Sequence, residues 1–373
     1  MKAISMLIKP ASGKCNLRCS YCFYNDVASA RSVNDRGMMS LDTLEVCIKS
    51  ALGDVTEFCA IAFQGGEPTL VGLDFYKKLI EFEHKHNVKN VRITHAIQTN
   101  GMLIDDKWAS FFADHNFLVG LSIDGDLNNH DYFRLDAQAE SSHKRALSAA
   151  RVLEKYRADF NILSVVTKQF AKRPDRAWKF YKQQGFRFLQ FIPCLEDFSA
   201  ERGNAIYSLS ANDYGRFLCR TFDLWYEDYR KGDYVSVRMF DNYIQMLMGK
   251  PPENCAMAGI CNAYALIEAD GSVYPCDFYA VDEYLLGSVH TDSFEAMLTG
   301  KAALEFTEPS KKVEAECLSC EYAALCRGGC RRDRDYTGDG ALKLNCYCES
   351  YKKFFAHAAP KMIRIAQTLR NRH

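Results

Sequence analysis

Short apolar runs alternate with longer amphipathic segments along the first two thirds of this chain. The runs are typical of buried strands and cover Ile4 to Ile8, Ala60 to Phe63, Val91 to Ile97, Leu118 to Ile123, Phe160 to Val166 and Phe186 to Ile192. Apolar residues at three- and four-residue spacing predict helices over 41–52, 75–86, 105–114, 143–156 and 174–184. This alternation predicts an α/β fold, a parallel sheet curled into a partial (β/α)6 TIM-like barrel, with its chemistry at the carboxyl ends of the strands.

The chain changes character near residue 235. Nine of its sixteen cysteines lie between Cys255 and Cys348, whereas the barrel pattern ends before that region. We therefore predict a core domain over 1–234 and a small cysteine-rich domain over 235–373 that ends in a helix. A chain of 373 residues with 48% apolar content can bury a large core for both.

The amino-acid composition limits the classes of partner that this chain could bind. Lys plus Arg equals Asp plus Glu at 47 each, so no overall field favours nucleic acid, an anionic membrane or an acidic substrate. No segment resembles a signal peptide, and no apolar run reaches the roughly 18 residues of a membrane span. We expect a cytoplasmic protein that binds neither nucleic acid nor membrane. In that reducing compartment the cysteines are better explained as metal ligands than as disulfides.

Three cysteines follow the first predicted strand with the spacing Cys-x3-Cys-x2-Cys: Cys15, Cys19 and Cys22. Three thiolates can hold three irons of a four-iron cluster and leave the fourth iron open, which marks a reactive centre. The alternative is a zinc knuckle or three unrelated thiols.

This motif, with Tyr21 before the third cysteine, resembles the signature of radical S-adenosylmethionine (SAM) enzymes. The resemblance implies that SAM binds the open iron and is split into methionine and a 5′-deoxyadenosyl radical. The sequence Gln64-Gly65-Gly66-Glu67-Pro68, after the second strand, resembles the family's Gly-Gly-Glu-Pro element. The implied SAM-binding residues are Tyr21, Gly66, Ser122, Arg134 and Leu195. A turn, a capping Ser, a surface Arg and a core Leu are the structural alternatives, and Asn100-Gly101 indicates only a turn.

Eight cysteines of the second domain form two complete sets of four. Closed sets suit auxiliary four-iron clusters that carry electrons, with two structural zincs as the alternative. The spacing resembles the SPASM extension of peptide-modifying radical SAM enzymes. That resemblance assigns an inner cluster to Cys255, Cys261, Cys276 and Cys330, and an outer one to Cys317, Cys320, Cys326 and Cys348, with Cys346 competing for the last place. Arg327, Arg331, Arg332 and Arg334 are expected to balance cluster charge rather than bind RNA.

Several segments resemble anaerobic sulfatase-maturating enzymes in particular, including Leu7 to Ser12, Phe63 to Leu70, Gly271 to Tyr279 and Gly328 to Arg332. The resemblance implies three [4Fe-4S] clusters, SAM and a reductant such as ferredoxin or flavodoxin. The implied reaction converts Cys or Ser in a Cys/Ser-x-Pro/Ala-x-Arg segment of a sulfatase precursor to Cα-formylglycine. Asp277 is the implied proton acceptor, and Tyr24 and Gln64 are weaker candidates for orienting the substrate.

Two alternatives remain at this stage. One is another peptide-directed radical SAM reaction, either thioether cross-linking or epimerisation. The other is a non-catalytic iron–sulfur electron carrier, against which the open site at Cys15, Cys19 and Cys22 argues. The sequence leaves open the choice between Cys and Ser substrates and the oligomeric state. Oxygen-sensitive clusters predict an anaerobic host.

Overall fold

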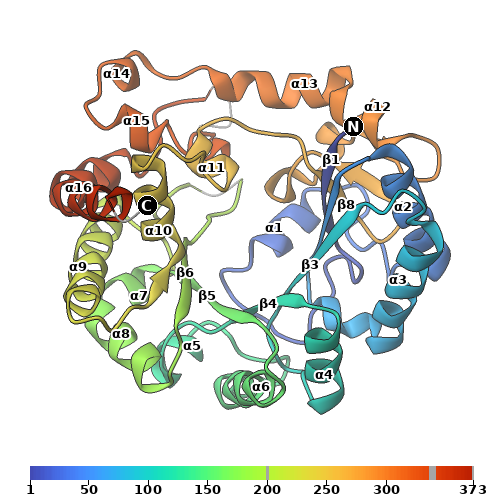
Figure 1. Ribbon diagram of the computed structural model, residues 1–373, viewed down its shortest axis with the longest axis horizontal. Coiled ribbons are helices and arrows are strands. Elements are labelled where there is room, and N and C mark those ends of the chain that lie inside the picture. Colours follow the sequence, from blue (N-terminus) through green and yellow to red (C-terminus); the bar gives the residue numbers. More distant parts are fainter. Residues whose placement is uncertain (199–200, 336–341, 372–373) are drawn as a thin grey trace. The chain divides into compact units, whose positions relative to one another are not determined.

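The computed structural model describes residues 1–198, 201–335 and 342–371, and the chain forms two compact units (Figure 1). The first unit contains Met1–Ser122, Asp131–Phe160 and Ala263–Phe306. The second contains Ile123–His130, Asn161–Asn262 and Thr307–His373. Each unit thus draws on three separate segments of the chain. The division at residue 235 follows the cysteines instead, and it stays a prediction.

A mainly parallel sheet organises the first unit. Its strands are β1 (Ala3–Ile8), β2 (Phe58–Phe63), β3 (Arg92–Thr99), β4 (Phe117–Ser122), β8 (Ala265–Ile267), β9 (Ser272–Tyr274) and β10 (Gly287–Ser288). They lie in the order β10-β9-β8-β1-β2-β3-β4. Pairing is parallel from β8 through β4, and β9 and β10 add antiparallel pairs. Because parallel strands end at one edge, the loops after β1, β2, β3 and β4 share that edge.

Helices follow these strands, and periodicity predicts all of them except the short α1 and α12. They are α1 (Phe23–Ser29), α2 (Leu41–Asp54), α3 (Leu73–His86), α4 (Asp106–Asp114), α6 (His143–Tyr156) and α12 (Phe294–Thr299). Side chains cap some of their first turns: Ser40 accepts from Thr43 N–H at 3.0 Å, and Asp105 accepts from Lys107 and Trp108 N–H. The fully buried Tyr76 of α3 packs edge-on against Phe63 of β2 with ring centroids 5.0 Å apart.

The second unit combines three parallel strands with the longest helices. The strands β5 (Phe160–Val166), β6 (Phe188–Pro193) and β7 (Ser236–Val237) pair in that order. The helices are α5 (Leu127–His130), α7 (Lys168–Ala171), α8 (Pro174–Gln183), α9 (Ala211–Arg230), α10 (Arg238–Leu247), α11 (Cys255–Ala258), α14 (Ala315–Leu318), α15 (Ala323–Cys326) and α16 (Cys348–Arg370). The terminal helix α16 lies beside α9 and α10 (Figure 1).

An aromatic cluster fixes α16 in this unit. The Phe354 ring is fully buried and stacks on Phe240 of α10 with centroids 5.7 Å apart. It also meets Phe222 of α9 edge-on at 5.9 Å. The neighbouring Phe355 contacts Tyr243 of α10 at 5.0 Å. Since Cys348 is the first residue of α16, this packing also fixes where that thiol lies.

The predicted strands and helices agree with the observed bounds to within two residues at every end. The predicted helix over 143–156 and the predicted strand over 160–166 coincide with α6 and β5. The short strands β8, β9 and β10 were not predicted, because runs of two or three residues carry no periodicity.

Replacing Phe354 with Ala should lower the free energy of unfolding by about 3–5 kcal/mol, because it leaves a cavity where three aromatic side chains meet. Anaerobic thermal unfolding followed by circular dichroism measures the change. Ile363→Ala on the same helix is the matched control, since that side chain is 40% exposed. Equal melting temperatures for the two variants would contradict this account of α16.

Candidate active site

The three cysteines of the first motif lie in the loop that joins β1 to α1. Two backbone hydrogen bonds hold this loop against the segment before α6. Arg18 N–H donates to the Leu135 carbonyl at 2.7 Å, and Ser20 N–H donates to the Phe133 carbonyl at 3.2 Å. Cys22 directly precedes the first turn of α1. The protein's own backbone therefore fixes the loop that presents the thiols.

The surroundings of these thiols favour a bound cation. Burial raises the pKa of the Cys15 thiol to about 11, and the charges of Glu67 and Cys22 act in the same direction. Burial also raises the pKa of the Cys22 thiol. The charge of Cys22 acts on Cys15, so the thiolate forms of these residues would repel each other unless metal ions neutralised them. Soft sulfur ligands in a set of three fit an iron–sulfur cluster with one open iron.

The glycines after β2 bring a second loop against the cysteine loop. Gly66 has a φ of +53°, and a Cβ there would lie 2.1 Å from the Lys14 carbonyl oxygen. Gly65, at φ +85°, leaves room for the Lys9 side chain, which a Cβ would meet at 2.4 Å. The next residue, Glu67, donates its N–H to the Lys14 carbonyl at 2.7 Å. Only glycine permits this approach, which puts the predicted SAM-binding Gly66 beside the residue that precedes Cys15.

Glu67 itself is 1% exposed and accepts hydrogen bonds from the turn after β2 and from the end of β3. One oxygen accepts from Thr69 Oγ1 at 2.6 Å and from Thr99 Oγ1 at 2.7 Å. The other accepts from Asn100 N–H at 2.8 Å. Burial raises the pKa of Glu67, against the effect of these hydrogen bonds. This carboxylate ties the loop after β2 to the loop after β3.

Asn100 has a contact that sequence reasoning missed. Its side-chain amide lies 3.6 Å from Cys15 Sγ and donates to Asn16 Oδ1 at 2.7 Å. The sequence predicted only a turn here. The turn does form, since Met102 N–H donates to Asn100 Oδ1 at 2.9 Å, but the same side chain also reaches the cysteine motif. Its place at the end of a predicted parallel strand was the available signal.

The predicted SAM-binding residues fall in both units. In the first unit the Arg134 guanidinium lies over the Tyr21 ring at 5.4 Å, and Tyr21 meets Phe133 edge-on at 5.6 Å. Ser122 is buried at the end of β4, at the sheet edge that also carries Gly66. Leu195 belongs to the second unit and is half-buried after β6. The first unit thus brings Tyr21 and Arg134 together.

Asp277 is a buried carboxylate with one oxygen held and the other unpartnered. Its Oδ2 accepts from the Tyr24 hydroxyl at 2.6 Å and from Gln64 Nε2 at 3.4 Å. Its N–H donates to the Tyr264 hydroxyl at 2.7 Å. Its Oδ1 has no hydrogen-bond partner among the described residues. Burial raises the pKa of this carboxyl, although Lys9 and the Tyr24 hydrogen bond act against the rise.

Two buried cations and a buried carboxylate surround this group. Lys9 Nζ is 2.8 Å and Arg31 Nη1 is 2.6 Å from the same Glu268 oxygen, and all three side chains are at most 2% exposed. Lys9 Nζ also lies 4.7 Å from the centre of the Tyr24 ring. Burial acts to raise the pKa of Glu268, but Lys9 and Arg31 outweigh it and the net shift is downward. With Asp277, the cluster has two positive and two negative groups, so their charges can balance.

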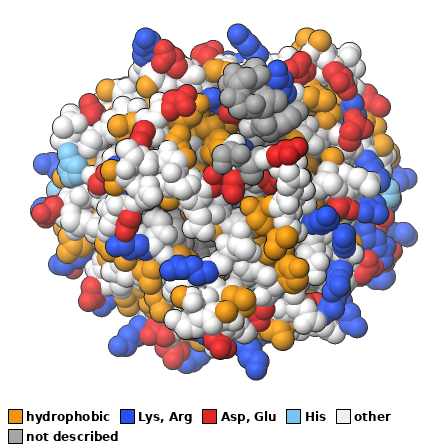
Figure 2. All heavy atoms as spheres, turned by 180° about the vertical axis from the view of Figure 1, so that it is seen from behind, with side chains coloured by type: hydrophobic (Ala, Val, Ile, Leu, Met, Phe, Trp, Pro, Cys, Tyr) orange, Lys and Arg blue, Asp and Glu red, His pale blue; other side chains and the backbone are white. Residues whose placement is uncertain are grey.

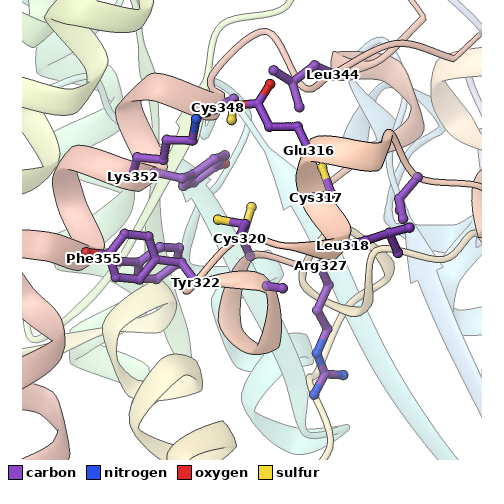
Figure 3. Close-up of a pocket in the computed structure, with 15 residues that line it drawn as sticks. Glu316, Cys317, Leu318, Cys320, Tyr322, Arg327, Leu344, Cys348, Lys352 and Phe355 are labelled. Carbon is purple, nitrogen blue, oxygen red and sulfur yellow. Dashed lines mark hydrogen bonds and ion pairs between the residues drawn. The ribbon is translucent and has the colours of Figure 1, made fainter.

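The predicted outer cysteines line one cavity in the second unit (Figure 3). Its volume is about 240 Å³, and Cys317, Cys320, Cys326 and Cys348 all border it. Figure 3 shows Cys317, Cys320 and Cys348 arranged around this space, with Phe355 and Tyr322 on one side. A cavity bordered by four thiols and apolar groups suits a closed four-iron cluster. Cys346 is not among its lining residues.

The predicted inner set is divided between the units. Cys255, Cys261 and Cys330 lie in the second unit, where Cys261 N–H donates to Ser310 Oγ at 2.8 Å. Burial raises the pKa of the Cys255 thiol, and the charge of Cys261 adds to the rise. Cys276 lies in the first unit, with Sγ 4.0 Å from the Tyr264 hydroxyl. The assignment of these four cysteines to one cluster stays a prediction.

The arginines around Cys330 are mostly internal. Arg331, Arg332 and Arg334 are buried, and Arg334 donates to the Ser310 carbonyl at 2.9 Å. They therefore do not form a basic surface patch. On the face shown in Figure 2, Lys and Arg side chains alternate with Asp and Glu. Among the described residues no helix is long and apolar enough to cross a membrane.

Comparison with known protein families supports both halves of this description. The radical SAM superfamily matches residues 10–168. The SPASM family, an iron–sulfur cluster-binding domain, matches residues 259–321. The cysteine motif and Gly-Gly-Glu-Pro loop lie in the first match, and Cys261, Cys276, Cys317 and Cys320 lie in the second.

Curated relatives match along nearly the whole chain. A cysteine-type anaerobic sulfatase-maturating enzyme of Clostridium novyi is 44% identical and covers 99% of both chains. One from Clostridium perfringens is also 44% identical, over 99% of this chain and all of the relative. A serine-type enzyme of Bacteroides thetaiotaomicron is 31% identical over 99% of this chain and 93% of its own.

Solved structures agree with the sequence comparison. Native anSMEcpe with bound AdoMet and Cp18Cys peptide superimposes with a TM-score of 0.95 at 43% identity, covering 98% of this chain and 99% of that one. The partial-barrel fold, the SPASM region and the long terminal helix predicted from the sequence are thereby confirmed. Family membership also rules against the electron-carrier and zinc alternatives. The chain belongs to the anaerobic sulfatase-maturating enzymes, which are radical SAM enzymes with a SPASM domain.

Proposed function

We propose that this chain oxidises the target cysteine of a sulfatase precursor to Cα-formylglycine, within an extended Cys-x-Pro/Ala-x-Arg segment. The observation that carries the proposal is the buried Asp277 carboxylate, which follows Cys276 directly and keeps Oδ1 unpartnered among the described residues. The full-length identity of 44% to cysteine-type relatives, against 31% to a serine-type one, favours cysteine over serine.

The residues assigned to each cofactor are those that the family resemblance implies. When bound by Cys15, Cys19 and Cys22, a four-iron cluster with SAM supplies a 5′-deoxyadenosyl radical that removes one hydrogen from the substrate Cβ. Tyr21, Gly66, Ser122, Arg134 and Leu195 would hold SAM. The inner set of cysteines would hold an electron acceptor and the outer set a third cluster. A donor such as ferredoxin or flavodoxin would supply the priming electron in the cytoplasm.

Asp277 takes the proton of the substrate thiol at Oδ1. Tyr24 and Gln64 bond to Oδ2, so Oδ1 is the oxygen left to accept the proton. Burial raises its pKa and makes it a stronger base, while Lys9 opposes the shift and favours the ionised form. Loss of one hydrogen atom, one proton and one electron leaves a thioaldehyde, whose hydrolysis gives formylglycine and sulfide.

The cysteine preference predicts a difference between two peptides. Under anaerobic conditions with SAM and dithionite, a peptide containing Cys-x-Pro-x-Arg should yield formylglycine faster than the same peptide with Ser at the target position. Mass spectrometry follows both products. A faster reaction with Ser would contradict the cysteine assignment. A stable thioether cross-link, which has lost two hydrogens and kept its sulfur and does not hydrolyse to formylglycine, would contradict formylglycine formation.

Replacing Asp277 with Asn should lower the rate of formylglycine formation by about 10²-fold or more, since general-base catalysis contributes about 10²–10⁴-fold. Deoxyadenosine should still form, and the iron content should be unchanged. Asp282→Asn is the matched control, because Asp282 is exposed and its carboxylate contacts the Ser32 N–H and the Arg36 guanidinium. A formylglycine rate near wild type in D277N would show that this carboxylate is not the proton acceptor.

The assignment of Cys348 rather than Cys346 to the outer cluster predicts which substitution releases iron. Cys348→Ala should lose about one third of the iron, because Cys348 borders the outer cavity. Cys346→Ala should keep its iron, since that thiol lies outside the cavity lining. Iron analysis of anaerobically reconstituted protein makes the comparison. Full iron in C348A together with loss in C346A would exchange the two assignments.

A further inference from the structure

Asn100 occupies the turn after β3, at the sheet edge that carries the cysteine loop. Its backbone N–H is held by Glu67 at 2.8 Å, and its side-chain oxygen accepts from Met102 N–H at 2.9 Å. The side chain is thereby held from two directions. Asn100 is 8% exposed, so water competes little for its remaining groups.

The amide nitrogen of Asn100 has two N–H groups, and both have acceptors in the cysteine motif. One acceptor is Asn16 Oδ1 at 2.7 Å, and the other is Cys15 Sγ at 3.6 Å. Leu17 N–H reaches the same sulfur at 3.3 Å. Two N–H donors from different parts of the chain therefore converge on the sulfur of Cys15.

We infer that Asn100 is a positioning residue for the radical-generating cluster, and that its amide raises the reduction potential by donating to the Cys15 sulfur. The inference rests on the proposed cluster at Cys15, Cys19 and Cys22. Reduction adds negative charge to a cluster, and a donor to sulfur stabilises the more negative state. Partners that orient a metal ligand change the metal's properties in the same way.

The alternative role for Asn100 is that of a turn former alone. The two roles depend on different atoms of one side chain. The turn uses Oδ1, which accepts from Met102, whereas the contact with Cys15 uses the amide nitrogen. Asn100→Asp keeps a side-chain oxygen that can accept from Met102 N–H. It replaces the amide nitrogen, which donates to Cys15, with a second oxygen that can only accept. This substitution therefore separates the two roles with almost no change of shape.

The experiment is a redox titration of the full-length, reconstituted enzyme followed by electron paramagnetic resonance. The cluster in question is identified as the signal that changes on addition of SAM. We expect a lower midpoint potential in Asn100→Ala and a still lower one in Asn100→Asp, because the latter adds a negative charge beside the sulfur. The rate of deoxyadenosine formation at a fixed reductant potential should fall in the same order.

Asn87→Asp is the matched control. Asn87 also bonds to backbone in a loop, to Val91 N–H and Val91 O at 2.8 Å each, but its side chain has no hydrogen bond to the cysteine motif in the described part of the chain. The midpoint potential of the SAM-responsive cluster in Asn87→Asp should equal that of the wild type. An unchanged potential in N100D would overturn the inference, and so would loss of the SAM-responsive cluster from N100D, which would limit Asn100 to cluster assembly. A wild-type enzyme with no SAM-responsive signal would instead overturn the proposed function.

Discussion

The buried carboxylate of Glu67 links the loops on which the rest of the site depends. The backbone N–H of Glu67 donates to the carbonyl of Lys14, the residue before Cys15. The Glu67 carboxylate accepts from Thr99 and Asn100 at the end of β3. A buried carboxylate is costly unless its oxygens are hydrogen-bonded, and here both oxygens have partners. The same bonds that satisfy Glu67 therefore fix three loops at one sheet edge. The glycines before it allow the approach, since a side chain at Gly66 would strike the Lys14 backbone.

A second group of buried charges serves the proton acceptor. Glu268, Lys9 and Arg31 lie next to the Asp277 site, and each ion is expensive to bury alone. Removing one partner would leave an unbalanced charge, so the four groups act as a set. Such a set is weak evidence for stability, but it keeps Asp277 in a defined electrostatic environment. Tyr24 and Gln64 both bond to Asp277, and their role in orienting the substrate stays a prediction.

Much of this could be predicted from the sequence, because the signals are local. The strands β1 to β6 and the helices between them follow from periodicity. The spacing of the cysteines indicates how many cluster ligands there are, whereas their division into an inner and an outer set rests on the family resemblance. The missed features depend on contacts between distant residues. Lys9 and Glu268 are 259 positions apart, and β8 joins β1 although only three residues pair. The local sequence Asn100-Gly101 predicts a turn, whereas the contacts of the Asn100 amide with Cys15 and Asn16 join distant parts of the chain, which no local pattern reveals.

The choice between Cys346 and Cys348 shows the same limit. Both cysteines have suitable spacing, and only the placement of α16 brings Cys348 to the outer cavity. Spacing alone does not distinguish two cysteines that are two residues apart, whereas packing places only Cys348 among the residues that line the cavity. The aromatic contacts of Phe354 and Phe355 provide that packing.

The central claim is that this chain removes a hydrogen atom from Cβ of the target cysteine. The most direct test uses a peptide whose target cysteine carries deuterium at both Cβ positions, incubated anaerobically with enzyme, SAM and dithionite. Mass spectrometry of the nucleoside should show one deuterium in 5′-deoxyadenosine, in proportion to the formylglycine formed. Formylglycine accompanied by deoxyadenosine without deuterium would contradict the claim, because the hydrogen would then have come from another source.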